Sequence, residues 1–226
     1  MPEIILHQWE ISPYCGKVRR LLRHKGLPFQ VREYNGLRVL AAGKLSPAGK
    51  LPVLEYDGER IQDSSRIAAF IEERHPEPAL IPKSGREAHL VHIFEDWADE
   101  SLYWYEVYFR FMWTEAADKA FAVIQQGRPA WEKKLIVTSA VPMMRQKLRA
   151  QGIGKYDAAT VTGQFLEHLR HLEGLLAEGD WLVGGQCTLA DIAVVSQLAE
   201  VKRTSHLAPR FADFPRVSAW MARVGD

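Results

Sequence analysis

The sequence has few cysteines, almost no net charge and no long apolar run. Its two cysteines, Cys15 and Cys187, lie far apart, which excludes a disulfide framework and a zinc site built of cysteine alone. Lys and Arg number 29 against 28 Asp and Glu, so the chain as a whole has no charge that attracts nucleic acid or an anionic membrane. No apolar run approaches the ~18 to 20 residues of a membrane helix, and the first residues lack the pattern of a signal peptide. We therefore expect a cytoplasmic protein that binds neither nucleic acid nor membrane.

The length and composition fit a folded protein of two domains. The chain has 226 residues, of which 47% are hydrophobic and 25% charged. This is longer than one ordinary domain of roughly 100 to 150 residues, and the composition is close to that of globular proteins. Two closely packed domains are the expected arrangement.

The first third of the chain alternates between strand and helix patterns. Residues 3–8 form a short apolar run, residues 14–25 have helical spacing after Ser12 and Pro13, and residues 29–34 alternate as in a strand. A hairpin is predicted around Asp57 and Gly58, followed by a helix over 64–75. The order βαβ, irregular segment, ββα predicts a mixed four-stranded sheet with helices packed against it.

A segment rich in proline separates this part from a helical one. Residues 76–86 contain three prolines and a glycine without periodicity, which is typical of a linker. We assign 1–76 to an α/β domain, 77–86 to the linker and 87–226 to the second domain. Helical spacing recurs there over 87–113, 128–151, 156–178 and 188–201. The second domain is predicted to be all-α.

Ser12, Pro13, Tyr14 and Cys15 stand at the junction of the first strand and first helix. Free amides and the helix dipole favour a negative charge at such a position by about 0.3 to 1 kcal/mol. A thiolate would be stabilised there. The sequence is equally consistent with Ser12 as a plain helix cap and Cys15 as a buried core residue.

Two further segments offer backbone groups to a ligand. Pro52 opens a strand, and a cis bond after Leu51 would turn the backbone amide and carbonyl of residue 51 outward, whereas a trans proline would only mark the strand's entrance. Asp63 and Ser64 precede the next helix, where they either cap it or hold a charged ligand.

The order of these segments resembles the cytosolic glutathione transferase family. The motifs SPYCGKVR, LSPAGKLPVLEYDG and QDSSRIAAFIEE precede a helical domain, and GQCTLADIA resembles the family's helix-capping box with Thr188 and Asp191. FADFPRVSAWMARV resembles its terminal helix. The resemblance covers nearly the whole chain and implies a thioredoxin-like first domain, a homodimer and a role in detoxification. It also implies no cofactor, with glutathione as co-substrate.

The resemblance assigns a role to each matching residue. It implies that Ser12, with Pro13 beside it, donates a hydrogen bond to the sulfur of glutathione. Lowering a thiol pKa by two units requires ~2.7 kcal/mol, and one hydrogen bond to a charged group supplies about 1.5 to 3. Ser12 and the helix start would therefore suffice.

The resemblance assigns the other matching residues to the remaining parts of glutathione. They imply that Lys50 meets the glycyl carboxylate, that Leu51 and Pro52 pair with the cysteinyl backbone, and that Asp63 and Ser64 hold the γ-glutamyl end.

Cys15 leaves other functions open. The related glutaredoxins have Cys-Pro-Tyr-Cys, with the nucleophilic cysteine at the position of Ser12 and the resolving cysteine at that of Cys15. A Cys15-dependent thiol-disulfide transferase is therefore an alternative to conjugation. A non-catalytic binding or interaction protein that keeps the scaffold is another, because a fold does not determine a function.

The pocket for the acceptor substrate is expected in an aromatic helix. We assign a stripe at positions 97, 101, 104, 105, 108 and 112 to the helical core, which leaves Tyr103, Phe109 and Trp113 as candidates for the cleft or a subunit contact. Such a pocket would take a small hydrophobic electrophile. No metal site is expected, because the pairs His89/His92 and His168/His171 lack an evident third ligand.

Overall fold

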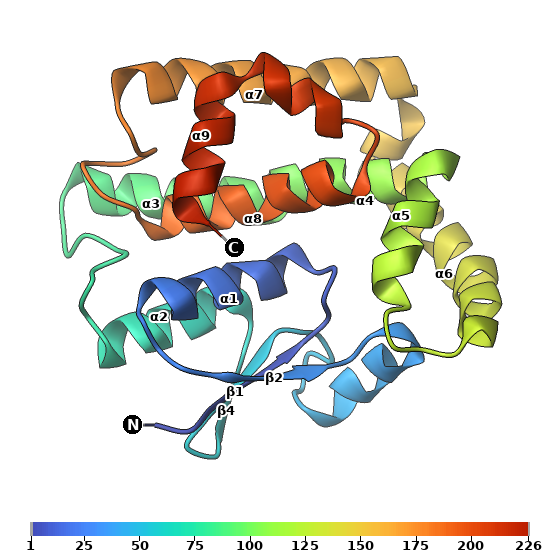
Figure 1. The fold of residues 1–226 in the computed structure, drawn as a ribbon, viewed down its shortest axis with the longest axis horizontal. Helices are drawn as coiled ribbons and strands as arrows, with labels where there is room; N and C mark the ends of the chain where they lie inside the picture. Colours follow the sequence, from blue (N-terminus) through green and yellow to red (C-terminus); the bar gives the residue numbers. More distant parts are fainter. Residues whose placement is uncertain (1, 226) are drawn as a thin grey trace.

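The computed structural model describes residues 2–225, without the side chains of residues 114–117. Residues 4–74 contain a sheet and two α-helices, and residues 86–224 contain helices and connecting segments (Figure 1). The predicted fold class, an α/β domain followed by an all-α domain, is confirmed.

The sheet has four strands in the order β2-β1-β3-β4. Strand β1 is parallel to β2 and antiparallel to β3, and β3 is antiparallel to β4. Asp57 and Gly58 at the hairpin both have positive φ, 48° and 86°. A two-residue type I′ turn requires positive φ at both of its central residues. The strands are β1 (Ile4–Gln8), β2 (Gln30–Glu33), β3 (Val53–Tyr56) and β4 (Glu59–Gln62).

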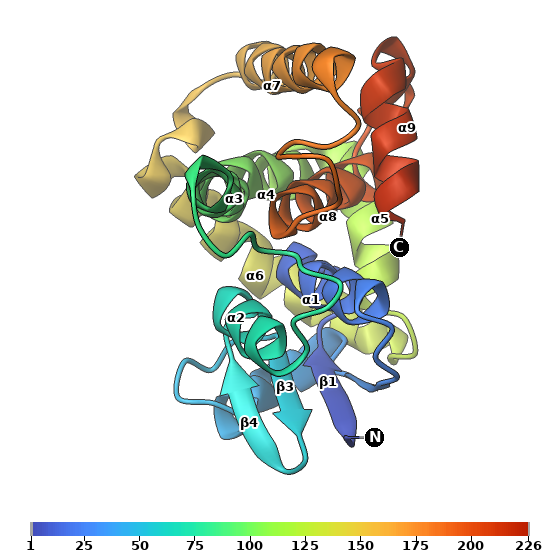
Figure 2. The ribbon, with the colours of Figure 1, turned by 90° about the vertical axis from the view of Figure 1, so that its left-hand side faces the viewer.

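Helices α1 (Pro13–His24) and α2 (Ser64–Arg74) lie between the sheet and the helical domain (Figure 2). The apolar side chains of α1, including Val18 and Leu21, share one core cluster with Leu6 of β1 and Ile192 of the helical domain. The two parts of the chain are therefore joined by a continuous apolar core. The segment between β2 and β3 contains a 3₁₀ helix, η1 (Gly36–Lys44).

Helix α8 (Leu189–Thr204) is central to the helical domain. Thirteen of its sixteen residues are buried, as expected of a helix covered on all sides. It packs against α1 and against α3 (Arg86–Asp96), η2 (Trp97–Leu102), α4 (Tyr103–Phe111), α5 (Thr114–Ile124), η4 (Ala208–Asp213) and α9 (Pro215–Val224). The other elements of the domain are α6 (Ala130–Gln151), η3 (Ile153–Lys155) and α7 (Ala158–Glu178). Helix α5 and the π-helical turn η2 were not predicted from the sequence.

The start of α8 contains the predicted capping box. Asp191 is fully buried, and its Oδ2 accepts from the Thr188 amide and hydroxyl, both at 2.8 Å. Its Oδ1 accepts from the Leu182 amide and from Trp220 Nε1, both at 2.9 Å. One carboxylate therefore joins the start of α8, the loop before it and α9.

We predict that Asp191→Ala lowers the free energy of unfolding by about 3 kcal/mol, because it leaves several buried donors without an acceptor. Urea denaturation followed by circular dichroism measures the change. Asp213→Ala is the control, because Asp213 is 54% exposed in a surface pair with Arg210 and its loss should cost at most about 0.5 kcal/mol. Equal effects of the two substitutions would contradict the assignment.

Candidate active-site cleft between the domains

A cleft of about 770 Å³ lies between the α/β domain and the helical domain. All seven residues matched to glutathione binding line it: Ser12, Pro13, Lys50, Leu51, Pro52, Asp63 and Ser64. The facing wall comes from α3, η2 and α4, and includes His92, Glu95, Asp96, Asp99, Glu100, Tyr103 and Arg110. Segments separated by up to about a hundred residues thus meet at one site.

Ser12 is the N-cap of α1. Its Oγ accepts from the Cys15 amide at 3.4 Å, and its own amide donates to the Trp9 carbonyl at 3.0 Å. The Ser12 side chain also makes a hydrogen bond that lowers the pKa of the buried Cys15 thiol, against the larger effect of burial. A weakly exposed donor beside the positive end of a helix dipole can stabilise an anion in the cleft.

The backbone around Leu51 is available to a ligand. The Leu51–Pro52 peptide bond is cis, and β3 begins only at Val53. Within the described part of the chain, neither the amide nor the carbonyl of Leu51 takes part in a hydrogen bond. Both groups are therefore free to pair with an extended peptide in the cleft.

Asp63 caps α2 and keeps one oxygen free. Its Oδ1 accepts from the amides of Ser65 at 3.0 Å and Arg66 at 3.2 Å. Its Oδ2 makes no hydrogen bond with residues 2–225, so this exposed oxygen can accept from an ammonium group. The cap explains how Asp63 stays in place at a positive φ of 75°.

A buried ion cluster holds the two walls of the cleft together. Lys17 of α1 is 1% exposed, and its Nζ lies 2.8 Å from Glu95 Oε1, 2.5 Å from Asp99 Oδ2 and 3.3 Å from Ser65 Oγ. The Tyr14 hydroxyl donates to the Asp99 carbonyl at 2.7 Å. Burial raises the pKa of the Asp99 carboxyl, and the Lys17 ammonium acts against that shift. The π-helical turn η2 places Asp99 where both contacts form.

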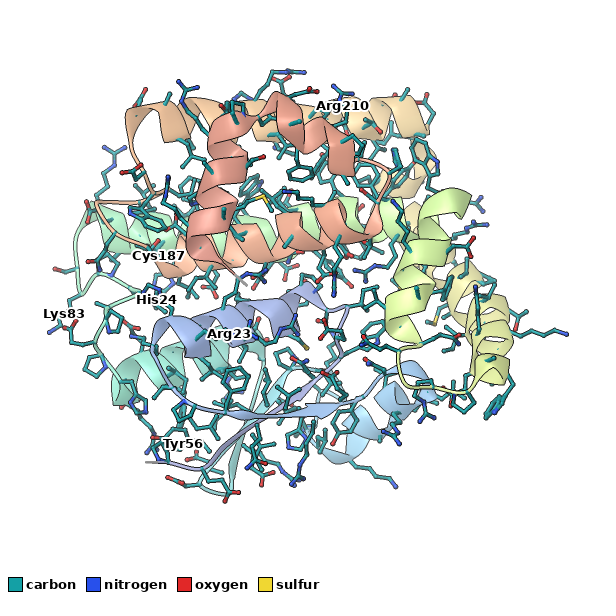
Figure 3. The ribbon with its side chains drawn as sticks, viewed as in Figure 1. Arg23, His24, Tyr56, Lys83, Cys187 and Arg210 are labelled. Atoms are coloured by element: carbon teal, nitrogen blue, oxygen red, sulfur yellow. The ribbon has the colours of Figure 1, made fainter. Side chains whose placement is uncertain are left out.

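Cys15 does not reach the cleft. Its side chain is 0% exposed, and its Sγ accepts from the Trp9 amide at 3.4 Å. Burial raises the pKa of the Cys15 thiol to about 11, opposite to the shift that a nucleophilic cysteine needs. Cys187 is also buried, before α8 and on the side of the molecule away from α5 and α6 (Figure 3), and its thiol pKa is raised to about 12.

We predict that neither cysteine of the folded protein reacts with a coloured disulfide reagent at pH 8 within minutes. A thiol of pKa about 11 is ionised to about one part in a thousand at that pH, and burial blocks access as well. Absorbance of the released thiolate measures the reaction. Protein unfolded in guanidinium is the control and should release two equivalents. If folded wild-type protein and folded Cys15→Ala are both labelled quickly, Cys187 is accessible. If the wild type is labelled quickly and Cys15→Ala is not, Cys15 is not buried.

The three aromatic candidates for the acceptor pocket lie in different places. Tyr103 lines the cleft, with its ring centroid 5.1 Å from that of Tyr14. Phe109 does not: it is 0% exposed in the helical core, with its ring 5.3 Å from that of Phe165. Trp113 lines a separate groove, where it stacks on His206 at 3.7 Å.

The structure therefore places neither Phe109 nor Trp113 in this cleft, and a subunit contact at Trp113 stays a prediction. The sequence predicts one continuous helix over 87–113, whereas a π-helical turn over 97–102 changes which face of the helix the later residues occupy. The chain also leaves α4 after Phe111, so Trp113 no longer belongs to that helix face.

Several residues of the cleft were missed. Trp9, Asp99, Glu100 and Arg110 line it but matched no motif. A signal was present for Arg110, which is a lone cation in the aromatic run YWYEVYFRFMW. A charged residue on a helix otherwise suited to the core needs a buried partner or a function.

Two other properties bear on function. Among the described residues, no three His, Cys, Asp or Glu side chains form a group suited to a metal ion. None of the helices in that part of the chain has the length and apolar character to cross a membrane.

Comparison with known proteins decides the family. Residues 6–79 match the family model for the glutathione S-transferase N-terminal domain, and residues 147–223 match that for the C-terminal domain. The chain belongs to the glutathione S-transferase family. This transferase-family chain is 26% identical to a Pseudomonas putida glutathione S-transferase over 224 residues, which cover 98% of this chain and 86% of the relative. It is 27% identical over 229 residues to FtsZ-localized protein A of Caulobacter vibrioides, with the same coverage.

Solved transferase structures agree with the fold. A glutathione S-transferase from Methylobacterium radiotolerans, in complex with glutathione sulfonate, superposes with a TM-score of 0.62 at 25% identity, covering 98% of this chain and 90% of that one. The beta-etherase LigF from Sphingobium has a TM-score of 0.69 at 22% identity, with coverage of 98% and 94%. The latter likeness shows the fold alone.

Proposed function

We propose that this protein binds glutathione in the cleft and transfers it to small hydrophobic electrophiles. The observation that carries the proposal is the set of polar groups around the cleft. The Ser12 hydroxyl lines the cleft at the N-terminus of α1, and the Leu51 backbone and Asp63 Oδ2 are unpaired among the described residues. Their chemistry matches a thiolate, a peptide backbone and an ammonium group, which are the three parts of glutathione in that order. The glutathione sulfonate bound to the Methylobacterium relative supports the same ligand class.

Ser12 lowers the pKa of the bound thiol in this proposal. A hydrogen bond to a charged acceptor contributes about 1.5 to 3 kcal/mol, and the N-terminus of α1 adds to it. Together they meet the ~2.7 kcal/mol for a shift of two units. The proton leaves to solvent, so no general base is required. The thiolate then attacks an electrophile held on the Tyr103 side of the cleft, where proximity supplies further rate.

We predict that Ser12→Ala raises the pKa of bound glutathione by about 1 to 2 units and lowers kcat/KM at pH 7 by about 10- to 100-fold. Since the group titrates at higher pH in the variant, the loss should shrink as the pH rises. Ultraviolet difference titration of thiolate absorbance, with 1-chloro-2,4-dinitrobenzene as the acceptor for kinetics, measures both.

Ser84→Ala is the matched control, because Ser84 is an exposed serine in the connection between the domains. It should leave both quantities unchanged. If Ser12→Ala keeps the wild-type thiolate titration, Ser12 does not activate glutathione.

Two alternatives remain distinguishable from conjugation. The burial of Cys15 and the direction of its pKa shift count against thiol-disulfide transfer. A non-catalytic interaction protein is supported by the similarity to FtsZ-localized protein A over 98% of this chain. Calorimetric titration with glutathione distinguishes this interaction protein from a transferase. The absence of glutathione binding would favour the interaction protein.

We also propose that the protein is a cytoplasmic homodimer that acts in detoxification. Helix α3 supports the dimer, because Ile93 is 62% exposed between the half-buried Leu90 and Phe94 on one helix face. An apolar helix surface of this kind is typical of a subunit contact.

We predict that Ile93→Asp converts the dimer to a monomer, because it places a charge in the contact. Size-exclusion chromatography with light scattering measures the mass. The control Leu175→Asp changes a leucine of α7 that is 44% exposed and should leave the mass unchanged. A wild-type protein with the mass of one chain would refute the dimer.

A further inference from the structure

Arg110 of α4 is a buried cation that contacts the turn carrying Ser12. Its side chain is 3% exposed, and its Nη2 donates to the Ile11 carbonyl at 3.0 Å. Ile11 is the residue before Ser12 in the chain and is itself 0% exposed. Within residues 2–225, the Ile11 carbonyl accepts no other hydrogen bond. The helical domain therefore provides the partner of a backbone group next to the proposed thiolate-stabilising hydroxyl.

Two carboxylates hold the guanidinium in place. Glu106, one helical turn earlier, forms an ion pair with Arg110, and Glu200 Oε2 of α8 lies 3.8 Å from its Nη2. Glu106 and Glu200 are 1% and 4% exposed. Arg203 binds the same Glu200 at 2.8 Å and continues to Glu10 at 2.9 Å. The network thus runs from α4 through α8 to the loop that leads into Ser12.

The geometry of the turn makes the position of Ser12 sensitive to this contact. The amide of Ser12 donates to the Trp9 carbonyl, so residues 9–12 form one tight turn. Arg110 fixes the carbonyl in that turn, and it also lines the cleft. A guanidinium suits this task because its planar fork donates in several fixed directions at once. An ammonium presents its donors at a single atom.

We propose that Arg110 is a positioning residue for Ser12: by binding the Ile11 carbonyl, it orients the hydroxyl toward the glutathione sulfur. This inference rests on the proposed function. Arg110 acts through Ser12 in this arrangement, and its charge is balanced by Glu106 and Glu200. The helical domain thereby contributes to thiol activation as well as to the acceptor side of the cleft.

The test removes the contact without leaving an unpaired buried charge, because Glu200 keeps Arg203 as its partner. The paired variant Arg110→Met with Glu106→Leu deletes both partners of the ion pair and keeps the net charge of the protein. We expect the pKa of bound glutathione to rise by about one unit and kcat/KM at pH 7 to fall about tenfold. The dissociation constant for glutathione, measured near pH 5.5 where the bound thiol is protonated in both proteins, should change less than twofold. Ultraviolet titration, calorimetry and conjugation kinetics on the full chain provide the three readouts.

A double-mutant comparison asks whether Arg110 acts through Ser12. In a Ser12→Ala background, the paired substitutions should lower kcat/KM less than twofold, because the hydroxyl that they position is absent. A direct effect of the guanidinium charge on the sulfur would persist in that background. A full tenfold loss there overturns the proposal.

Arg145→Met is the matched control. Arg145 Nε donates to the Phe111 carbonyl at 2.8 Å, so this variant also deletes a bond from arginine to a backbone carbonyl of α4, but away from Ser12. It should leave the thiol pKa unchanged. Equal shifts in the two variants would overturn the proposal and indicate a general effect on α4.

Arg110→Lys is a second variant for the case that the paired variant does not fold. It keeps the charge and should raise the thiol pKa in the same direction with about a threefold loss of kcat/KM. If wild-type protein lowers the pKa of bound glutathione and the Arg110 variants lower it equally, the role of Arg110 is overturned while the proposed function stands. If wild-type protein does not lower the pKa of the bound glutathione thiol, both the proposed function and the role of Arg110 are overturned.

Discussion

The packing of α1 against α8 is the contact on which the rest of the structure depends. Val18, Leu21 and Leu22 of α1 belong to the same core cluster as Leu189 and Ile192 of α8. Interfaces between domains are commonly polar and allow movement, whereas here the hydrophobic effect acts across the boundary as it does within a domain. The N-terminus of α1, and Ser12 with it, is therefore held at a fixed place relative to the helical wall of the cleft.

Buried charges add direction to this apolar contact. Lys17, Glu95 and Asp99 join α1 to α3 and η2, and Arg110, paired with Glu106, joins α4 to the turn before Ser12. Ion pairs removed from water are costly, and they contribute little stability compared with apolar replacements. Their fixed hydrogen-bond geometry can specify one arrangement of the cleft among several of similar apolar burial. Ser12 and the unpaired groups of Leu51 and Asp63 line the cleft that this arrangement leaves open.

Local sequence was enough for most of the α/β domain. Its strands are short apolar or alternating runs, and Ser12, Pro13, Asp57 and Gly58 mark the turns by their own backbone preferences. The same holds for the capping box of α8, where Thr188 and Asp191 are three residues apart. The seven residues that the ordered motifs match to glutathione binding all line one cleft in the structure.

The sequence by itself thus determined the fold class, the family and one wall of the candidate site, because those features depend on neighbouring residues and on motif order. Tertiary structure alone decided the other wall. The burial of Phe109 depends on the π-helical turn before it, and the burial of Cys15 depends on which face of α1 is covered. The carboxylate partners of Lys17 and the carbonyl that Arg110 binds lie about 80 to 100 residues away along the chain. Contacts over such separations arise from the packing of whole helices, and no periodicity or spacing within one segment encodes them.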